Sequence, residues 1–199
     1  MFLKAFLPLL LAPLVATTPT SIEARQYITA NDLDTGNCKD GTVVGPEVCD
    51  DLKMQLGGNV GCQGIGGAYT AGLAENFLPG NTAPQDVQAA VQVFEQCSQK
   101  CPKAKIVAGG YSQGSAVIDG SIQRLSGEVR DKVKAVVLFG FTRNLQDGGR
   151  IPGYPKDQTK VFCAVGDMVC DGTLIITAAH LTYGANAGEA ASFLAQHVK

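Results

Sequence analysis

Short apolar runs alternate with segments of helical periodicity along most of the chain. One run, VKAVVLFGF, is so continuously apolar that both faces of its strand must be covered. The runs that predict strands are 104–110, 133–141 and 160–165, and helical spacing covers 82–97, 115–125 and 189–198. Strands that alternate with helices predict an α/β fold, a three-layer α/β/α sandwich with a mostly parallel sheet.

The preceding part of the chain gives weaker signals. Residues 25–58 are rich in Asp, Gly and Asn, and we interpret them as a loop followed by a helix around Val48 to Leu56. Residues 60–65 are interpreted as a short strand, and residues 76–80 as an exposed loop. No repeat or second domain is evident, so residues 31–199 are predicted to form a single catalytic domain.

The first 18 residues, MFLKAFLPLLLAPLVATT, have the pattern of a secretory signal peptide. A lysine near the start precedes an apolar run, and small residues follow it. The run is shorter than a membrane span requires, and prolines interrupt it. We therefore expect a secreted, extracellular protein with no membrane span. Residues 19–30 are interpreted as a pro-segment or a flexible N-terminus.

Composition narrows the class of protein further. The chain has 199 residues, 45% of them hydrophobic, which describes one ordinary globular domain. Its 16 Lys and Arg are balanced by 18 Asp and Glu, so the chain has no excess of positive charge that would favour binding to nucleic acid. We expect a monomer that binds no nucleic acid.

The chain has seven cysteines, which in an oxidising compartment are expected to pair. They are Cys38, Cys49, Cys62, Cys97, Cys101, Cys163 and Cys170. Because the number is odd, at least one stays free or joins another chain. Spacing favours a local pair of Cys163 with Cys170 and leaves the other connections open. With no Cys-x-x-Cys pair and only two histidines, no metal site is predicted.

A Gly-x-Ser-x-Gly sequence, residues 110–114, lies between a predicted strand and a predicted helix. In this context the motif is typical of a strained turn that exposes the serine hydroxyl above a sheet. The glycines are needed because larger side chains on either side of the serine would collide. Ser112 is therefore the candidate nucleophile.

A serine hydroxyl needs a base that accepts its proton and an acid that orients the base. Of the two histidines, His197 lies in the last turn of a predicted helix, where a surface cation is favourable. His180, in a loop after the last predicted strand, is the candidate base. In this fold the acid follows the nucleophile at the end of a strand and precedes the histidine. Asp167 fits this order, and Asp171 is the second candidate.

These residues and their surroundings resemble the fungal cutinase family, secreted serine esterases of the α/β-hydrolase superfamily. The resemblance extends from Gly45 to the C-terminus. The motifs that carry it are GPEVCDDL, CQGIGGAY, LPGNT, KCPKAKIVAGGYSQG, VLFGFTRN, GRIPGYP and KVFCAVGDMVC. It implies the triad Ser112, Asp167 and His180, with the backbone N–H of Gln113 in the oxyanion hole. It also implies hydrolysis of cutin and similar short aliphatic esters, with no cofactor and no metal.

The resemblance further implies a set of cross-links and a substrate-binding rim. The implied disulfides join Cys38 with Cys101, Cys49 with Cys62, and Cys163 with Cys170, which leaves Cys97 as a small buried thiol. The implied substrate-binding residues are Leu78, Tyr111, Ile176 and Leu181. An exposed apolar rim suits an insoluble polyester surface, which makes cutin the expected partner.

One segment departs from the family pattern. Only six residues separate Cys38 from Gly45, where the family is expected to have a strand and a loop that completes the oxyanion hole. We therefore expect the chain to lack one strand. Loss of one oxyanion donor costs about 10² to 10³ in turnover. Two alternatives to a cutin-hydrolysing esterase stay open. One is an acetylxylan esterase, and the other is a relative with impaired catalysis that binds a surface.

Overall fold

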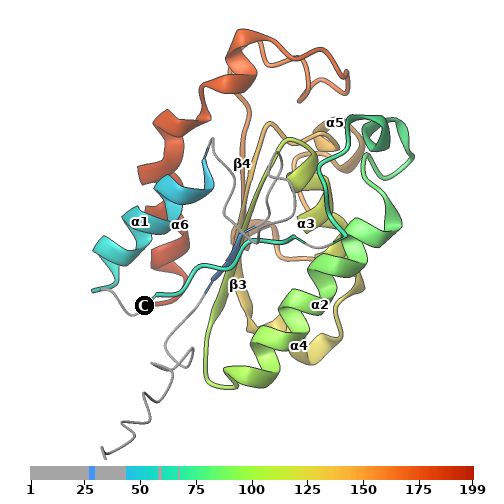
Figure 1. The fold of residues 1–199 in the computed structure, drawn as a ribbon. Helices are drawn as coiled ribbons and strands as arrows, with labels where there is room; N and C mark the ends of the chain where they lie inside the picture. The colour runs from blue at the N-terminus through green and yellow to red at the C-terminus, as the bar shows by residue number, and fades with distance from the viewer. Residues whose placement is uncertain (1–26, 30–43, 58–59, 67) are drawn as a thin grey trace, which may run out of the picture.

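The residues that the structure describes form a four-stranded parallel sheet between two layers of helices. The computed structural model describes residues 27–29, 44–57, 60–66 and 68–199. The strands are β1 (Tyr27–Thr29), β2 (Ile106–Tyr111), β3 (Val133–Phe139) and β4 (Thr159–Phe162). They pair in the order β1-β2-β3-β4, and every described pairing is parallel (Figure 1). The expected α/β/α sandwich is thus confirmed.

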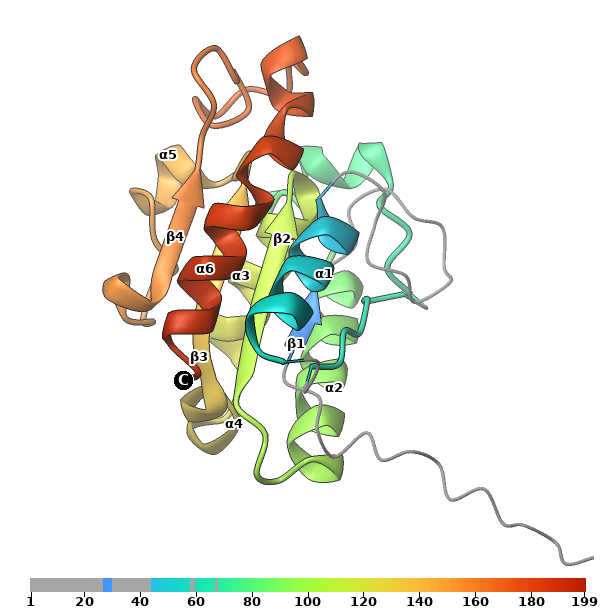
Figure 2. The same cartoon turned by 90° about the vertical axis from the view of Figure 1, so that its left-hand side faces the viewer.

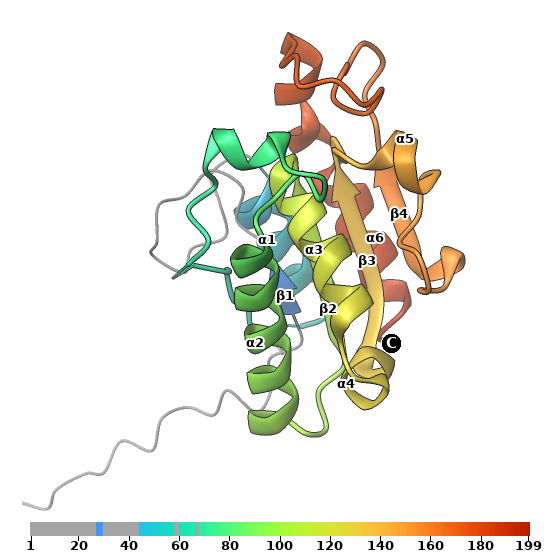
Figure 3. The ribbon, with the colours of Figure 1, turned by 90° about the vertical axis from the view of Figure 1, so that its right-hand side faces the viewer.

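Helices cover both faces of the sheet. On one face α1 (Gly45–Gln55) packs beside α6 (Ala187–Gln196), in front of the sheet in Figure 2. On the other face α2 (Pro84–Lys100) packs against α3 (Gln113–Arg124), as Figure 3 shows. The shorter helices are η2 (Leu73–Phe77), α4 (Gly127–Lys132), α5 (Asn144–Asp147), η3 (Lys156–Gln158), η4 (Ala178–Leu181) and η5 (Tyr183–Asn186).

Strand β3 shows why its apolar run is unbroken. Val136 and Leu138 belong to the core under α2 and α3, whereas Val137 and Phe139 belong to the core under α1 and α6. Successive side chains of a strand point to opposite faces, so a strand that is covered twice needs apolar residues at every position. All of β3 except Lys134 is buried. The predicted double coverage of this strand is confirmed.

The predicted strands at 104–110, 133–141 and 160–165 and the helices of residues 82–198 are confirmed, with shifts of a few residues at their ends. Two expectations before residue 82 were wrong. Residues 60–65 form no strand, and Gly64 makes only an isolated bridge there, because glycines and the disulfide of Cys62 favour an irregular path. Part of the predicted exposed loop at 76–80 is helical, since η2 continues to Phe77.

Tyr27–Thr29 form an edge strand, although residues 19–30 were predicted to be a pro-segment or a flexible N-terminus. Three residues are too few to show an alternating pattern. The predicted signal peptide lies outside the described residues, and so does the short connection after Cys38 apart from Val44. None of the described helices is long and apolar enough to cross a membrane.

The carboxyl ends of the strands meet at one edge of the sheet. Ser112 follows β2, Gly140 follows β3, and the segment that carries Asp167 follows β4. Ladder hydrogen bonds extend past the strand ends, since Ser112 N donates to Phe139 O and Gly140 N donates to Phe162 O. In parallel sheets this edge is where ligands bind.

Candidate active site

Ser112 occupies a sharp turn between β2 and α3. Its φ of 54° lies in the left-handed region, which non-glycine residues rarely adopt. Gly110 makes the turn possible, because a Cβ atom there would lie 2.7 Å from Ser115 Cα. The strand, the strained serine and the following helix together form the nucleophile elbow that the sequence predicted.

The structure brings Ser112, His180 and Asp167 together in one hydrogen-bonded chain. His180 Nε2 lies 2.9 Å from Ser112 Oγ, and His180 Nδ1 lies 2.9 Å from Asp167 Oδ2. His180 and Asp167 are both buried. This is the arrangement of a nucleophile, its base and the acid that orients the base.

Two further donors hold the Asp167 carboxylate in place. Val169 N donates to Oδ1 at 3.0 Å, and Tyr183 Oη donates to Oδ2 at 2.5 Å. Tyr183 Oη also accepts a hydrogen bond from Ala164 N. Burial, and then the hydrogen bond to Asp167, raise the pKa of Tyr183 above its ordinary value, so the phenol keeps its proton. Sequence reasoning missed Tyr183, because no motif marks a tyrosine three residues after the histidine.

Tyr111 and Gly140 shape the surroundings of His180. Tyr111 Oη donates to the backbone oxygen of His180 at 2.8 Å, and its ring lies 5.0 Å from the imidazole between centroids. A Cβ atom on Gly140 would come within 2.6 Å of His180 Cε1, so the imidazole lies against bare backbone. Tyr111 was predicted as a substrate-binding residue. It lines the cavity beside Ser112, although it is only 4% exposed.

A cavity of about 280 Å³ opens above Ser112 and His180 between two apolar walls. Residues 72–81 form one wall, here called the 72–81 wall, with Leu73 and Phe77 facing the cavity. Residues 174–181 form the second, the 174–181 wall. It contains Ile176 and Leu181, which are 58% and 59% exposed. The predicted exposure of these two apolar residues is thus confirmed.

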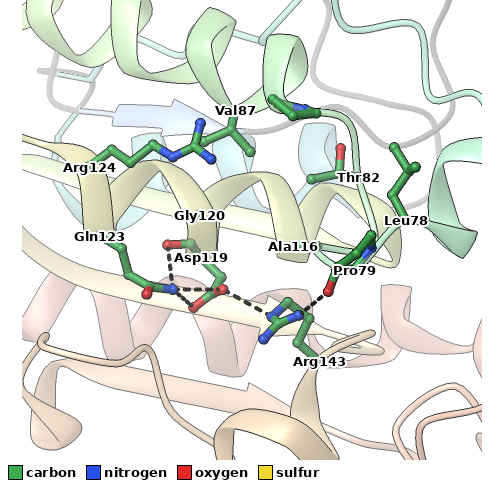
Figure 4. Close-up of a pocket in the computed structure, with 12 residues that line it drawn as sticks. Leu78, Pro79, Thr82, Val87, Ala116, Asp119, Gly120, Gln123, Arg124 and Arg143 are labelled. Atoms are coloured by element: carbon green, nitrogen blue, oxygen red, sulfur yellow. Dashed lines mark hydrogen bonds and ion pairs between the residues drawn. The ribbon is translucent and has the colours of Figure 1, made fainter.

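Leu78 differs from the other predicted rim residues. It is 40% exposed, but it lines a second cavity of about 580 Å³ together with Pro79 and Gly80. Figure 4 shows this cavity, which Val87 of α2 and Ala116 of α3 also line. The 72–81 wall thus contributes residues to two cavities.

Gln113, predicted to supply an oxyanion donor, is the first residue of α3. The first N–H groups of a helix have no partner within the helix, and the helix dipole is positive there. The Gln113 side chain donates from Nε2 to Gly72 O at 2.8 Å. Thr142 also lines the cavity, and its buried Oγ1 has no hydrogen-bond partner among the described residues. Thr142 lies in the VLFGFTRN motif, which gave it no predicted role.

Two of the three implied disulfides lie within the described residues, joining Cys49 to Cys62 and Cys163 to Cys170. Cys101 is buried, and its expected partner Cys38 lies outside the described residues. Cys97 carries no disulfide and is only partly buried, against the core under α2. Burial, and then the neighbouring Cys101, raise the pKa of Cys97 to about 11, so it is a protonated thiol.

The candidates that were set aside lie outside the triad. His197 follows α6, where its Nδ1 contacts Phe193 O at 2.8 Å, and Asp171 is exposed. Among the described residues, no group of three or more His, Cys, Asp or Glu side chains could hold a metal ion.

Comparison with known proteins identifies the family of the chain. The family model described as cutinase matches residues 26–198. "Cutinase 3" of Emericella nidulans is 59% identical, over 94% of this chain and 91% of that protein. The solved cutinase of Trichoderma reesei, in complex with a phosphonate inhibitor, has a TM-score of 0.73 and 32% identity, over 88% of this chain and 77% of that one. The catalytic core of a Trichoderma reesei acetyl xylan esterase shares the fold, with a TM-score of 0.65 and 17% identity, over 86% and 98% of the two chains.

The alignment with the Emericella nidulans relative covers 202 positions, although it uses only 94% of a chain of 199 residues. That relative therefore has residues that lack a counterpart here, in keeping with the short connection after Cys38. The family model nevertheless spans most of the chain, and it includes all three triad positions. The chain with this triad and these walls belongs to the cutinase family.

Proposed function

We propose that this protein is a secreted serine esterase that hydrolyses the carboxylic ester bonds of cutin and similar aliphatic esters. The observation that carries the proposal is the hydrogen-bonded chain from Ser112 through His180 to Asp167, at the base of a cavity with apolar walls. Membership of the cutinase family supports the same reaction and substrate class.

In the proposed mechanism, Ser112 Oγ attacks the ester carbonyl while its proton moves to His180 Nε2. Asp167 stabilises the imidazolium through Nδ1. The carbonyl oxygen becomes an oxyanion that the Gln113 N–H, at the positive end of α3, would stabilise. His180 then returns the proton to the leaving alcohol. Water, activated by the same histidine, releases the acid from the acyl-enzyme.

The apolar walls favour an aliphatic substrate over a sugar ester. Leu73, Phe77, Ile176 and Leu181 are all more than half exposed and lie beside the cavity. Exposed apolar groups gathered at a site mark a binding surface for an apolar partner. Such a rim suits the surface of an insoluble polyester. Secretion, which the predicted signal peptide supports, would deliver the protein to it.

A second candidate function is a surface-binding relative with weak catalysis. The observation that favours it is the residues present in the Emericella nidulans relative but absent here. If those residues include an oxyanion donor, turnover falls by about 10² to 10³. Such a protein adsorbs to cutin but reacts slowly with an organophosphate at Ser112.

Hydrolysis of a short-chain nitrophenyl ester, measured beside the Ser112→Ala variant, tests the proposal. We expect activity in the native protein and a loss of at least about 10⁴-fold in the variant, because no other group attacks the ester. Release of acids from cutin and of acetate from acetylated xylan then separates the two substrate classes. A folded protein that adsorbs to cutin but neither hydrolyses esters nor is labelled at Ser112 would contradict the esterase proposal.

A further inference from the structure

The 72–81 wall lies on the surface of the molecule and has little packing of its own. No residue from Ala71 to Asn81 is buried. The wall is bracketed by two strained positions, since Ala71 and Asn81 have φ values of 55° and 54°. Its internal hydrogen bonds include one from Asn81 Nδ2 to Asn76 O at 2.8 Å. The wall is therefore a small structured unit whose position depends on its attachments.

Among the described residues, two side-chain hydrogen bonds attach this wall to the rest of the protein. Gln113 Nε2 donates to Gly72 O at 2.8 Å at one end of the wall. Arg143 Nη1 donates to Pro79 O at 2.7 Å at the other. Gln113 belongs to the active site, whereas Arg143 lies outside the triad, just before α5. The wall is thus held at one end from the catalytic turn and at the other by a guanidinium.

Beside Leu78, Pro79 and Gly80, the cavity of about 580 Å³ leaves space where packing would otherwise fix the position of this end of the wall. Pro79 and Gly80 line this cavity from the wall, and Ala116 and Gly120 line it from α3. Arg143 extends to the Pro79 carbonyl beside this space, as Figure 4 shows. Without that hydrogen bond, the wall has room to move away from Ser112.

Two carboxylates orient the Arg143 side chain. Asp147 on α5 accepts from Nε at 2.8 Å and from Nη2 at 3.2 Å, in a bidentate pair. Asp119 on α3 lies 3.5 Å from Nε. With Nε and Nη2 engaged on one side, Nη1 is left to point at Pro79. A lysine has no such fork and could not reproduce this arrangement.

Asp119 is the member of this cluster that titrates near neutral pH. It is 1% exposed, and its two oxygens contact Gln123 Nε2 at 3.0 Å. Burial, and then the charge of Asp147, raise the pKa of Asp119 to about 7, although Arg143 and Gln123 act in the opposite direction. Arg124 is the remaining charged residue that lines the same cavity. Asp119, which supplies the second negative charge beside Arg143, is thus fully ionised only above neutral pH.

We propose that Arg143 is a positioning residue that sets the width of the active-site cavity. By holding Pro79, it keeps Leu73 and Phe77 of the wall beside the acyl chain of the substrate, and an ionised Asp119 strengthens its hold. It touches neither Ser112 nor the ester, so it acts on substrate fit rather than on the chemical step. This inference rests on the proposed esterase function.

The first test compares Arg143→Ala with the native protein on a long-chain and a short-chain nitrophenyl ester. A hydrogen bond from a charged donor commonly changes an equilibrium by roughly tenfold. We therefore expect KM for the long-chain ester to rise roughly tenfold, while kcat for the acetate ester stays within about twofold. Arg150→Ala is the matched control, because Arg150 is an exposed arginine of the same connection. An equal loss of kcat on both esters would mean that Arg143 supports the site as a whole, and would overturn the proposal.

The second test uses pH and Asp119→Asn, which fixes the neutral form. The quantity to measure is kcat/KM for the long-chain ester divided by kcat/KM for the short-chain ester. Titration of the triad affects both esters equally, so it cancels in this ratio. In the native protein we expect this ratio to rise between pH 6 and 8. In the variant it should stay flat at the low-pH value. A native ratio that does not change with pH would refute the part assigned to Asp119.

Hydrogen exchange tests the attachment without any substrate. The amides of Glu75, Leu78 and Asn81 donate to backbone oxygens of the wall and report its opening. We expect them to exchange about tenfold faster in Arg143→Ala than in Arg150→Ala, with the amides of β3 unchanged. Unchanged exchange in the wall contradicts the positioning role, whatever the esters show. A native protein that hydrolyses no ester contradicts the proposed function instead.

Discussion

The two walls of the active-site cavity are similar in apolar character and different in construction. The 174–181 wall contains His180, whose side chain and backbone oxygen are both hydrogen-bonded into the site. Thr177 Oγ1 of the same wall donates to Gly166 O at 2.8 Å, next to Asp167. The 72–81 wall contains none of the triad and lines a second cavity. One wall thus belongs to the catalytic apparatus, and the other only faces it.

This difference separates catalysis from substrate fit. Movement of the 174–181 wall would displace the base, and a displacement of about 1 Å costs roughly 10² in rate. Movement of the 72–81 wall would change which acyl chains fit while the triad stays assembled. A protein that acts on an irregular polymer surface benefits from one adaptable wall beside one fixed wall.

The largest effect that tests this comparison should come from the two disulfides. Replacing Cys163 and Cys170 together by Ser removes the link that closes the Asp167 segment, whereas replacing Cys49 and Cys62 removes a link between α1 and the segment after it. Each loop closure contributes about 2 to 3 kcal/mol to the free energy of unfolding. We expect both double variants to unfold at lower denaturant concentration.

Only the first pair should also lower activity. With the link gone, Asp167 and His180 lose their fixed spacing, and we expect kcat to fall by roughly 10² under conditions where the protein is folded. The variant that lacks Cys49 and Cys62 is the control, because its free energy of unfolding should fall by a similar amount. If both variants kept full kcat, the pairing of Asp167 with His180 of the 174–181 wall would not depend on the disulfide, and the contrast between the walls would fail.

A smaller effect should come from Tyr183→Phe. This change removes one of the donors to Asp167 and leaves Val169 N in place. We expect kcat to fall roughly tenfold with little change in KM, because a less firmly held carboxylate orients His180 less well. Tyr154→Phe is the matched control, since Tyr154 Oη donates to Val133 O at 2.8 Å, at the opposite end of β3. Equal losses of kcat in both variants would point to a general packing defect.

Much of this site could be predicted from the sequence because its geometry follows local rules. The Gly110–Gly114 motif between a strand and a helix determines the position of Ser112. With two histidines in the chain, the choice of His180 required only the order of elements. Parallel strands then bring their carboxyl ends together, which accounts for Asp167.

The residues that were missed depend on contacts between distant segments. Tyr183 lies outside the quoted motifs, and the motif that contains Thr142 and Arg143 assigns them no role. The roles of all three appear only when β4, η5 and α5 lie at one edge of the sheet. The edge strand Tyr27–Thr29 was missed for a similar reason, since three residues give no period. Leu78 was assigned to the same rim as Ile176 because the sequence does not show that the 72–81 wall lines a second cavity from residue 78 onwards.

The smallest predicted effect concerns stability and comes from Asp119→Asn. Because the folded state raises the pKa of Asp119 from an ordinary value of 3.8 to about 7, the folded protein binds more protons than the unfolded chain between these values. The contribution of Asp119 to the free energy of unfolding is therefore greatest at low pH and is lost as pH rises towards 7. Asparagine stays neutral throughout and avoids that loss.

We thus expect Asp119→Asn to melt above the native protein by a smaller margin at pH 5 than at pH 8, with the margin growing by several degrees between the two pH values. Thermal unfolding at the two pH values measures this directly, with Asp131→Asn on the exposed face of α4 as the control. A lower melting temperature at pH 8 would mean that the ion pair with Arg143 outweighs the cost of burying the charge. If the variant gains stability but loses discrimination between long and short esters, the buried acid is retained because it holds the 72–81 wall, at some cost to the stability of the fold.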